Sequence, residues 1–291
     1  MKRILLFIIT NMAVMVLASI TLHIIGVDNY ITAQGLDLTS LLIFCCVFGF
    51  TGAFVSLLLS KWMAKKSTGT RLVAHPRDSK ERWLIDTVAE LSEKAGIGMP
   101  EVGIFPSPES NAFATGWNKN NALVSVSQGL LDRFSPSEAR AVIGHEIGHV
   151  ANGDMVTLAL IQGVVNTFVM FFARIIGYTV NACLRRNDNT FFYLTSFIAE
   201  IILGFLSSAI VMWFSRQREF RADAAGARFA GTENMIAALE RLRSEYEGPS
   251  VMPTALAAFG IRSGLKKGLA SMFTSHPPLD QRIAALNGAK L

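Results

Sequence analysis

Two histidines one helical turn apart, with a glutamate beside the first, are the residues of this sequence best suited to chemistry. His145, Glu146 and His149 lie in the stretch "IGHEIGHVANGD". On an α-helix the two histidines are roughly 40° apart around the axis and roughly 6 Å apart along it, so both imidazoles can bind one ion. Glu146 is turned by roughly 100°, so it cannot be a third ligand but can reach a water on the ion. The pattern predicts metal-assisted hydrolysis.

Zinc is the ion that we expect here, because it suits imidazole and carboxylate ligands and keeps its fourth position for water in catalytic sites. It lowers the pKa of that water from about 15.7 to about 7. The alternative is a pair of surface histidines on an ordinary helix. Gly144 and Gly148 argue against it. Each costs about 0.5–1 kcal/mol relative to alanine in a helix, which indicates close approach of another element.

A third ligand must come from elsewhere in the chain. The histidine that astacin-like sites place six residues after the second histidine is absent, because that position is Met155. Glu219 is favoured because Asp223 follows it by one turn and could accept the free N–H of a ligating histidine. The alternative for this pair is a solvated charged face with Arg218 and Arg221. The other candidates are the remaining histidines and downstream glutamates: His23, His75, His276, Glu200, Glu233, Glu240, Glu245 and Glu247.

The helix that carries the histidines should begin well before them, with Ser135 as N-cap, Pro136 at the first helical position and Glu138 completing a capping box. Asp78 and Glu81 match a second capping box. The helix after it carries an apolar stripe and ends before a glycine, at residues Leu84, Val88, Leu91, Ala95 and Gly96.

Strand patterns lie between these two helices. The stretch "MPEVGIF" predicts one strand, and "NAFATGW" and "NALVSVS" around "NKNN" predict a hairpin of two more. After the last apolar segment, helix is expected to about Arg243, followed by an irregular stretch, with a short final helix from Leu279 to Asn287.

The composition places much of this chain in lipid. Of the 291 residues only 17% are charged and 51% are hydrophobic, whereas about a quarter are charged in soluble proteins. Four segments reach the roughly 20 residues that a membrane crossing needs: Ile4–Gly26, Leu38–Leu59, Met155–Val180 and Phe191–Phe214. The first could instead be a signal peptide, but its apolar run is too long and no cleavage site follows.

Basic residues set the expected orientation. Lys2 and Arg3 precede the first hairpin and Lys61 follows it, while its loop "VDNYITAQGLD" carries no Lys or Arg. The positive-inside rule therefore predicts a cytoplasmic location for both ends of this hairpin. Because Met155 is only about 9 Å of helix beyond His149, the metal should lie near the cytoplasmic lipid boundary.

The second hairpin is less clear. Arg174 and Glu200 lie inside its segments, and we expect them to pair between neighbouring helices. Its loop carries Arg185 and Arg186, which an outside loop should not favour. The helices either span the membrane despite these arginines or lie shallow against it, and length favours spanning.

These patterns predict a mostly α integral membrane protein with four hydrophobic helices and a cytoplasmic α+β domain carrying a small β-hairpin. The expected divisions are a first transmembrane hairpin (1–60), the first part of the cytoplasmic domain (61–154), a second hairpin (155–214) and the second part of the domain (215–291). The net charge of +5 comes without basic–aromatic interleaving, so nucleic acid is not an expected partner. Cys45, Cys46 and Cys183 form no C-x-x-C pair and are interpreted as packing residues.

The stretch "HEIGHVANGD", followed after a membrane hairpin by "EFRAD", resembles the HtpX family of membrane-bound zinc metalloproteases. That family is similar in its core to the CAAX prenyl-protein protease and to a stress protease of the mitochondrial inner membrane. The resemblance covers essentially the whole chain. It implies a gluzincin-type protease domain with one Zn²⁺ held by His145, His149 and Glu219. Glu146 would be the general base, and Asp223 would support a ligand.

The resemblance also implies how substrate is held. "NAFATG" resembles the family's edge strand that pairs with the substrate backbone, at residues Asn111, Ala112, Phe113 and Ala114. An edge strand suits this role because its N–H and C=O groups are unpaired, although a plain structural hairpin is the alternative. "HPPLDQR" resembles a motif in which His276 and Arg282 face the scissile carbonyl or the substrate chain. From the residues alone, a helix-entry histidine before Pro277 is the preferred interpretation of His276.

The expected function is a zinc endopeptidase of the bacterial inner membrane that cleaves cytoplasmic segments of misfolded membrane proteins in quality control and stress response. Its partners would be the lipid bilayer and membrane or unfolded protein substrates. Two alternatives remain: a zinc hydrolase acting on a lipid or small amide, and a non-catalytic membrane scaffold or transporter, for which Arg174 and Glu200 are the best support.

Overall fold

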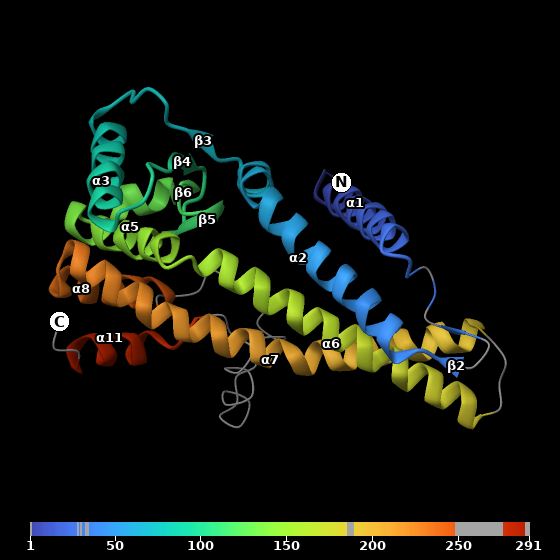
Figure 1. Ribbon diagram of the computed structural model, residues 1–291. Coiled ribbons are helices and arrows are strands. Elements are labelled where there is room, and N and C mark those ends of the chain that lie inside the picture. The colour runs from blue at the N-terminus through green and yellow to red at the C-terminus, as the bar shows by residue number, and fades with distance from the viewer. Residues whose placement is uncertain are drawn as a thin grey trace, which may run out of the picture. The chain divides into compact units, whose positions relative to one another are not determined.

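The computed structural model describes residues 2–27, 29, 31–32, 35–184, 189–247 and 276–288. The chain separates into two compact units. The first, called here the hydrophobic unit, comprises Met1–Leu59 and Thr157–Val211, and the second, the sheet unit, comprises Ser60–Val156 and Met212–Leu291. Figure 1 shows the elements of both. The irregular stretch expected after Arg243 lies mostly outside the described residues, as do Arg185 and Arg186.

The hydrophobic unit is built from long helices. It holds α1 (Lys2–Ile24), a small ladder of β1 (Ile31–Thr32) and β2 (Gly35–Leu36), and parts of α2 (Leu38–Thr68), α6 (Asp154–Cys183) and α7 (Asn189–Ala230). Among the described residues, α2, α6 and α7 are long and apolar enough to cross a membrane. In α1 the apolar stretch that the described residues provide is shorter, Val14–Ile24. The fourth crossing therefore stays a prediction.

Packing inside the hydrophobic unit explains two features of its sequence. A Cβ at Gly49 of α2 would lie 2.5 Å from Thr167 Oγ1 of α6, so only glycine allows this approach. Arg174 Nη1 lies 3.5 Å from Glu200 Oε2, which confirms the expected pair between α6 and α7. On the outer surface the large side chains are exposed and apolar, for example Phe197 and Phe205. This is the arrangement that lipid contact requires.

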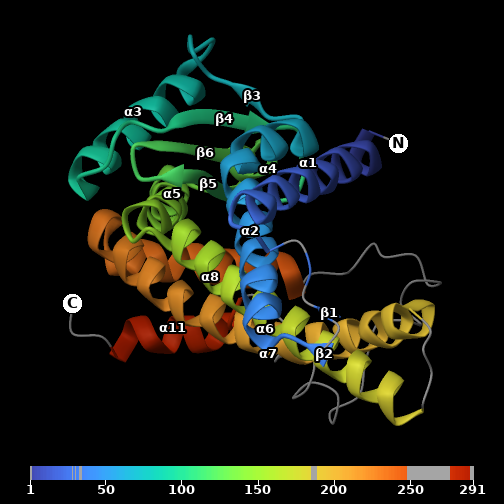
Figure 2. The same cartoon turned by 45° about the vertical axis from the view of Figure 1, so that its right-hand side comes forward.

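The sheet unit contains a four-stranded sheet, formed by β3 (Arg71–Leu72), β4 (Glu101–Phe105), β5 (Ala112–Asn118) and β6 (Asn121–Ser127). The strand order is β3-β4-β6-β5, with β4 and β6 parallel and the other pairs antiparallel, as Figure 2 shows. The hairpin predicted around "NKNN" is therefore β5–β6, in the register Ala112↔Val126. Its strand β5 lies at the edge of the sheet.

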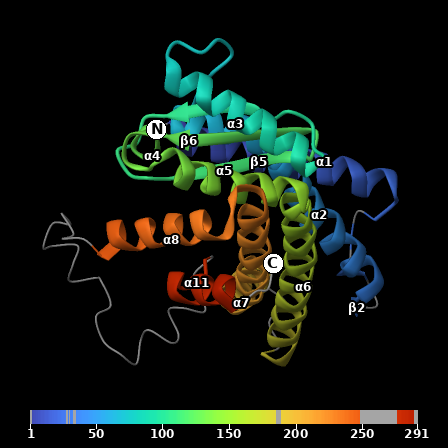
Figure 3. The ribbon, with the colours of Figure 1, turned by 90° about the vertical axis from the view of Figure 1, so that its left-hand side faces the viewer.

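Helices of the sheet unit form successive layers beneath β5: α5 (Pro136–Ala151) packs on β5, α8 (Thr232–Glu247) on α5, and α11 (Leu279–Gly288) on α8, as Figure 3 shows. Two further helices, α3 (Ser79–Ala95) and α4 (Gln128–Arg133), complete the unit together with the remaining parts of α2, α6 and α7. The core is apolar and buried, and includes Leu84, Leu91, Ile143, Ile147 and Leu239. Burying each such side chain contributes about 1.5–3 kcal/mol, which fixes α5 and α8 relative to the sheet.

The helix caps predicted from the sequence are present at most helix ends, with one correction. Ser135 and Glu138 form the complete capping box that the sequence predicts, and Gly96 ends α3 in the left-handed conformation. At the start of α3, Asp78 accepts from Glu81 N–H as predicted. The carboxylate of Glu81 does not complete that box, because it accepts from Arg71 and from the backbone N–H of Arg77 instead.

Candidate metal centre and substrate cleft

Helix α5 places the two histidines side by side. Both are buried, and their ring centroids lie 4.7 Å apart in a nearly perpendicular arrangement. Because the capped first turn lies well ahead of them, the histidines occupy the regular body of the helix. Because they are four residues apart on this helix, both imidazoles point to the same side of it.

Helix α7 brings a carboxylate to these rings. A Cβ at Gly148 would lie 2.7 Å from Ala225 Cβ on α7, and the Cβ of an alanine at position 144 would lie 3.4 Å from Gly226 Cα. The two glycines therefore allow α5 and α7 to cross closely, as expected from their presence in a helix. Glu219 Oε1 lies 3.3 Å from His149 Nε2, and Glu219 Oε2 lies 3.6 Å from His145 Nε2.

The three residues fit a divalent cation. One ligand atom from each of His145, His149 and Glu219 lies within 4.8 Å of the other two. Glu219 is fully buried, and its Oε1 has no hydrogen-bond donor in the described part of the chain. A buried carboxylate oxygen without a donor is costly unless a cation satisfies it. Two nitrogens and one oxygen are also a donor set that leaves a tetrahedral position open for water.

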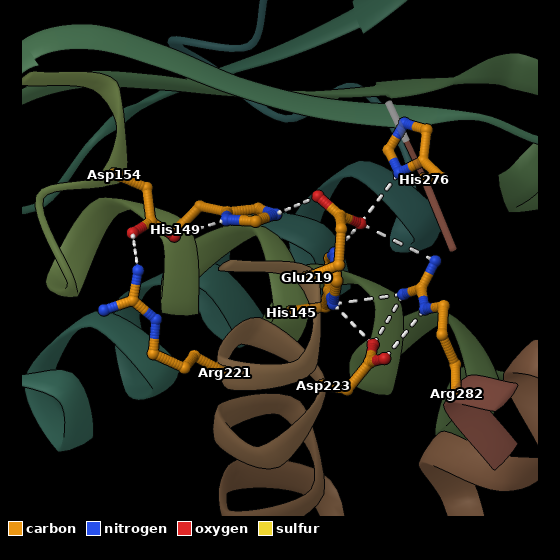
Figure 4. A network of polar contacts seen from close by, with 8 residues as sticks. All are labelled: His145, His149, Asp154, Glu219, Arg221, Asp223, His276 and Arg282. Carbon is orange, nitrogen blue, oxygen red and sulfur yellow. Dashed lines mark hydrogen bonds and ion pairs between the residues drawn. The ribbon is translucent and has the colours of Figure 1, made fainter. Parts of the chain in front are cut away.

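His145 is held by a carboxylate that an arginine holds in turn. Its Nδ1 lies 2.9 Å from Asp223 Oδ1, where the sequence placed the supporting acid. Arg282 of α11 donates from Nε to Asp223 Oδ2 at 2.7 Å and from Nη2 to Oδ1 at 2.5 Å. All three side chains are buried. We call this chain of contacts the His145 relay (Figure 4).

His149 has a relay of the same kind that sequence reasoning missed. Its Nδ1 lies 2.7 Å from Asp154 Oδ2, and Arg221 Nη2 lies 3.5 Å from Asp154 Oδ1, as Figure 4 also shows. Asp154 is 1% exposed and is the first residue of α6. The signal available in the sequence was an acid just after Gly153, where a positive φ of 67° turns the chain between the two helices.

These contacts set the charges of the site. Burial alone would raise the pKa of Glu219, but its close contacts with the imidazoles of His145, His149 and His276 outweigh it and hold that pKa well below its usual range. Burial alone would lower the pKa of His149, but its contacts with Asp154 and Glu219 outweigh it and raise that pKa to about 9. Arg282 and His145 likewise hold the pKa of Asp223 low against burial.

Glu146 lies on a different side of α5 from the histidines' shared face and is half-buried. With His145 and Glu219 it lines a cavity of about 650 Å³. The two residues of the carboxy-terminal motif reach the same cavity. His276 Nδ1 lies 2.7 Å from Glu219 Oε2, with 64% of its side chain exposed. Arg282 lines the cavity, although the sequence did not predict that its guanidinium would be engaged by Asp223.

The edge strand meets the cavity at its amino-terminal end. Asn111 and Ala112 line it, while Phe113 contacts Phe105, with ring centroids 5.5 Å apart. Among the described strands, β5 pairs only with β6. An extended peptide at the outer edge of β5 would therefore lie beside the cavity that Glu146, His145 and Glu219 line.

Comparisons with known proteins agree with this fold and site. The family model described as "Peptidase family M48" matches residues 78–290. Together with the buried His₂Glu cluster and the apolar helices, this defines the chain as a membrane metalloprotease.

Curated relatives narrow the class. "Protease HtpX" of Hahella chejuensis is 64% identical over 289 residues, covering 98% of this chain and 99% of its own length. "Protease HtpX" of Pseudomonas syringae pv. tomato is likewise 64% identical, over 291 residues with the same coverage. The chain therefore belongs to peptidase family M48 and, within it, to the HtpX proteases.

A solved structure supports the fold alone. The crystal structure of S. mikatae Ste24p matches with a TM-score of 0.63 at 20% identity. The match covers 84% of this chain and 58% of Ste24p.

Proposed function

We propose that the chain is a zinc endopeptidase that cleaves cytoplasmic segments of misfolded membrane proteins at the bacterial inner membrane, in membrane protein quality control. The observation that carries the proposal is the convergence of His145, His149 and Glu219, two of which, His145 and Glu219, line a cavity together with Glu146 and the start of an edge strand. A lipid or small amide substrate would need no strand-binding edge, and a scaffold would need no buried metal-ligand set.

The metal is proposed to be zinc, held by His145 Nε2, His149 Nε2 and a Glu219 oxygen. The two relays support this assignment, because each Nδ1 faces a carboxylate, which leaves each Nε2 free to ligate. A zinc ion bound there would supply an activated water at neutral pH and would polarise the scissile carbonyl.

Glu146 is proposed as the general base. It lines the same cavity as His145 and Glu219. In this role its carboxylate takes a proton from the attacking water and passes it to the leaving amine. His276 is proposed to help stabilise the negative charge on the carbonyl oxygen, since its exposed ring borders the same space. Arg282 contributes positive charge there while it holds Asp223.

The edge strand is proposed to hold the peptide. The carbonyl of Asn111 accepts from Ser127 N–H of β6 at 2.8 Å. Since successive residues of a strand direct their backbone groups to opposite sides, Ala112 and Ala114 direct theirs to the open edge. A substrate strand can pair with these groups whatever its sequence, and this suits an enzyme that acts on many unfolded chains.

The membrane arrangement completes the proposal. The length of the apolar segments favours four crossings, and the basic residues on either side of the first hairpin favour a cytoplasmic location for the amino terminus, both parts of the sheet unit and the carboxy terminus. In the sheet unit, Asp154 supports His149 and is also the first residue of α6. The chain thus leads directly from the candidate metal site into an apolar helix, and this supports substrates that are themselves membrane proteins.

The test is Glu146→Gln in the full-length protein in detergent, with Glu93→Gln on the exposed surface of α3 as the control. We expect the Glu146 variant to bind one zinc ion per chain while its cleavage of casein and of a detergent-solubilised membrane protein is nearly abolished. The control should keep both properties. Undiminished proteolysis by Glu146→Gln would refute the assigned base, and cleavage of casein but never of membrane proteins would refute the proposed substrates.

A further inference from the structure

The cavity beside Glu146 is lined by two groups of residues of different chemistry. The polar group holds two of the candidate metal ligands, His145 and Glu219, with His276 and Arg282. The other group, called here the apolar end, consists of leucine, valine and methionine side chains from α4, α5, α8 and α11 that belong to or pack against one hydrophobic core, namely Leu130, Val142, Met235, Leu239, Leu242 and Leu279. The whole cavity measures about 650 Å³, within the range of roughly 300–1,000 Å³ that is usual for ligand sites.

The spacing of residues along α5 and α8 brings the apolar end next to Glu146. Val142 precedes Glu146 by one turn of α5, so the two share a side of that helix. On α8, Met235, Leu239 and Leu242 recur at the spacing of one apolar face. Leu130, Met235 and Leu239 are fully buried, whereas Leu242, which also lines the cavity wall, is half-buried.

A peptide on β5 would direct a side chain into this end. Side chains of a strand alternate between the two faces of its sheet, and α5 packs against β5 on the face that carries the cavity. Ala112 lines the cavity and is small, so the edge strand itself does not fill the space. With the scissile carbonyl at the ligand set, one of the two residues flanking that bond must face the apolar end.

This inference rests on the proposed function and concerns the substrate of the same site. We propose that the apolar end is a side-chain subsite that selects a large, uncharged, apolar residue such as Leu, Met or Phe directly beside the scissile bond. The six residues that line it offer no side-chain charge or hydrogen-bond partner, so a charged side chain would be buried unpaired at a high cost. The preferred substrates are therefore exposed apolar segments of unfolded chains.

Matched peptides test the subsite. Full-length enzyme in detergent is given peptides that differ only at one flanking position, with Leu, Ala or Glu there, and both flanking positions are scanned. At one position we expect kcat/KM to be about 10- to 200-fold higher for Leu than for Ala, with Glu lower still. Equal rates for Leu and Ala at both positions would overturn the subsite alone, whereas cleavage of no peptide at all would overturn the proposed function.

Two variants locate the preference in the cavity. Leu242→Glu should reduce the Leu-to-Ala ratio at least 10-fold, because it places a charge in the wall. Leu131→Glu is the matched control, since Leu131 is also a half-buried leucine packed on the core but lines a separate pocket on α4. Its ratio should stay at the wild-type value. If Leu242→Glu does not fold, Leu242→Ala should instead raise the ratio of Phe to Leu peptides. An unchanged ratio in whichever Leu242 variant folds would overturn the assignment.

Discussion

The two histidines of the proposed metal site have the same kind of support, assembled from different parts of the sheet unit. His145 contacts Asp223 of α7, which Arg282 of α11 holds with two hydrogen bonds. His149 contacts Asp154 at the start of α6, which Arg221 of α7 approaches at 3.5 Å. Both relays order a histidine, an aspartate and an arginine in the same way (Figure 4).

The two relays differ most in the exposure of their arginines. The Arg282 side chain is 8% exposed, whereas that of Arg221 is 61% exposed. A buried, bidentate pair leaves a large unpaired charge when it is broken, while an exposed pair contributes little. The comparison indicates that His145 depends on the docking of the carboxy-terminal helix, whereas His149 depends on a local turn between α5 and α6.

Removing the buried arginine should have the largest effect on the fold. Arg282→Ala leaves Asp223 buried without its charged partner, and we expect a loss of about 3–5 kcal/mol in the free energy of unfolding. Thermal unfolding in detergent measures it. The double variant Asp223→Ala with Arg282→Ala should lose less than the sum of the two single variants. Equal melting temperatures for Arg282→Ala and Arg221→Ala would contradict the distinction between the relays.

Altering either aspartate should weaken metal binding next. Asp154→Asn and Asp223→Asn each remove the negative charge that faces a histidine Nδ1, and we expect the zinc dissociation constant to rise about 10- to 100-fold. Competition with a chelator of known affinity measures this. Asp132→Asn, at an exposed aspartate of α4 paired with Lys80, is the control. If only Asp223→Asn weakens binding, Asp154 has no part in holding the ligand.

The protein stripped of metal by a chelator should lose stability as the pH rises, because His149 then gives up a proton that the folded state binds tightly. Its folded pKa of about 9 lies above the ordinary value near 6.5. The contribution of protonated His149 to the free energy of unfolding is therefore fully present below pH about 6.5 and is lost as the pH rises through about 9. We expect the melting temperature of the stripped protein to fall by on the order of 5 °C between pH 7 and 9.5. A melting temperature that rises over this interval would contradict the assigned ion pair.

The smallest effect should follow from removing the exposed arginine. Arg221→Ala breaks a contact that solvent screens, so we expect a change of at most about 1 kcal/mol in the free energy of unfolding. Zinc affinity should change less than in Asp154→Asn, because the aspartate still accepts from His149. A loss of metal as large as that of the aspartate variant would show that Arg221 is required to position Asp154.

The parts of the site that a single helix encodes could be predicted from the sequence. His145, Glu146 and His149 share one helix, and Glu219 and Asp223 share another, so their relative placement follows from helical geometry. Gly144 and Gly148 even indicated that another element approaches, and that element is α7.

Contacts between distant elements could not be predicted in the same way. Arg282 meets Asp223 only because α11 packs on α8, and no local pattern encodes this. The parallel pairing of β4 with β6 depends on a chain crossing between strands that are not neighbours in sequence. Asp154 is intermediate between residues that share a helix and residues that meet only in the folded chain. It lies five residues from His149 but reaches it through the turn at Gly153.

The zinc content of Glu219→Ala tests the central claim most directly, because Glu219 is the one proposed ligand that the two-histidine motif does not supply. Glu233→Ala is the matched control, at an exposed glutamate of α8 that was also a candidate ligand. The full-length control should hold one zinc ion per chain, and Glu219→Ala should hold almost none after dialysis. Stoichiometric zinc of unchanged affinity in folded Glu219→Ala would contradict the account.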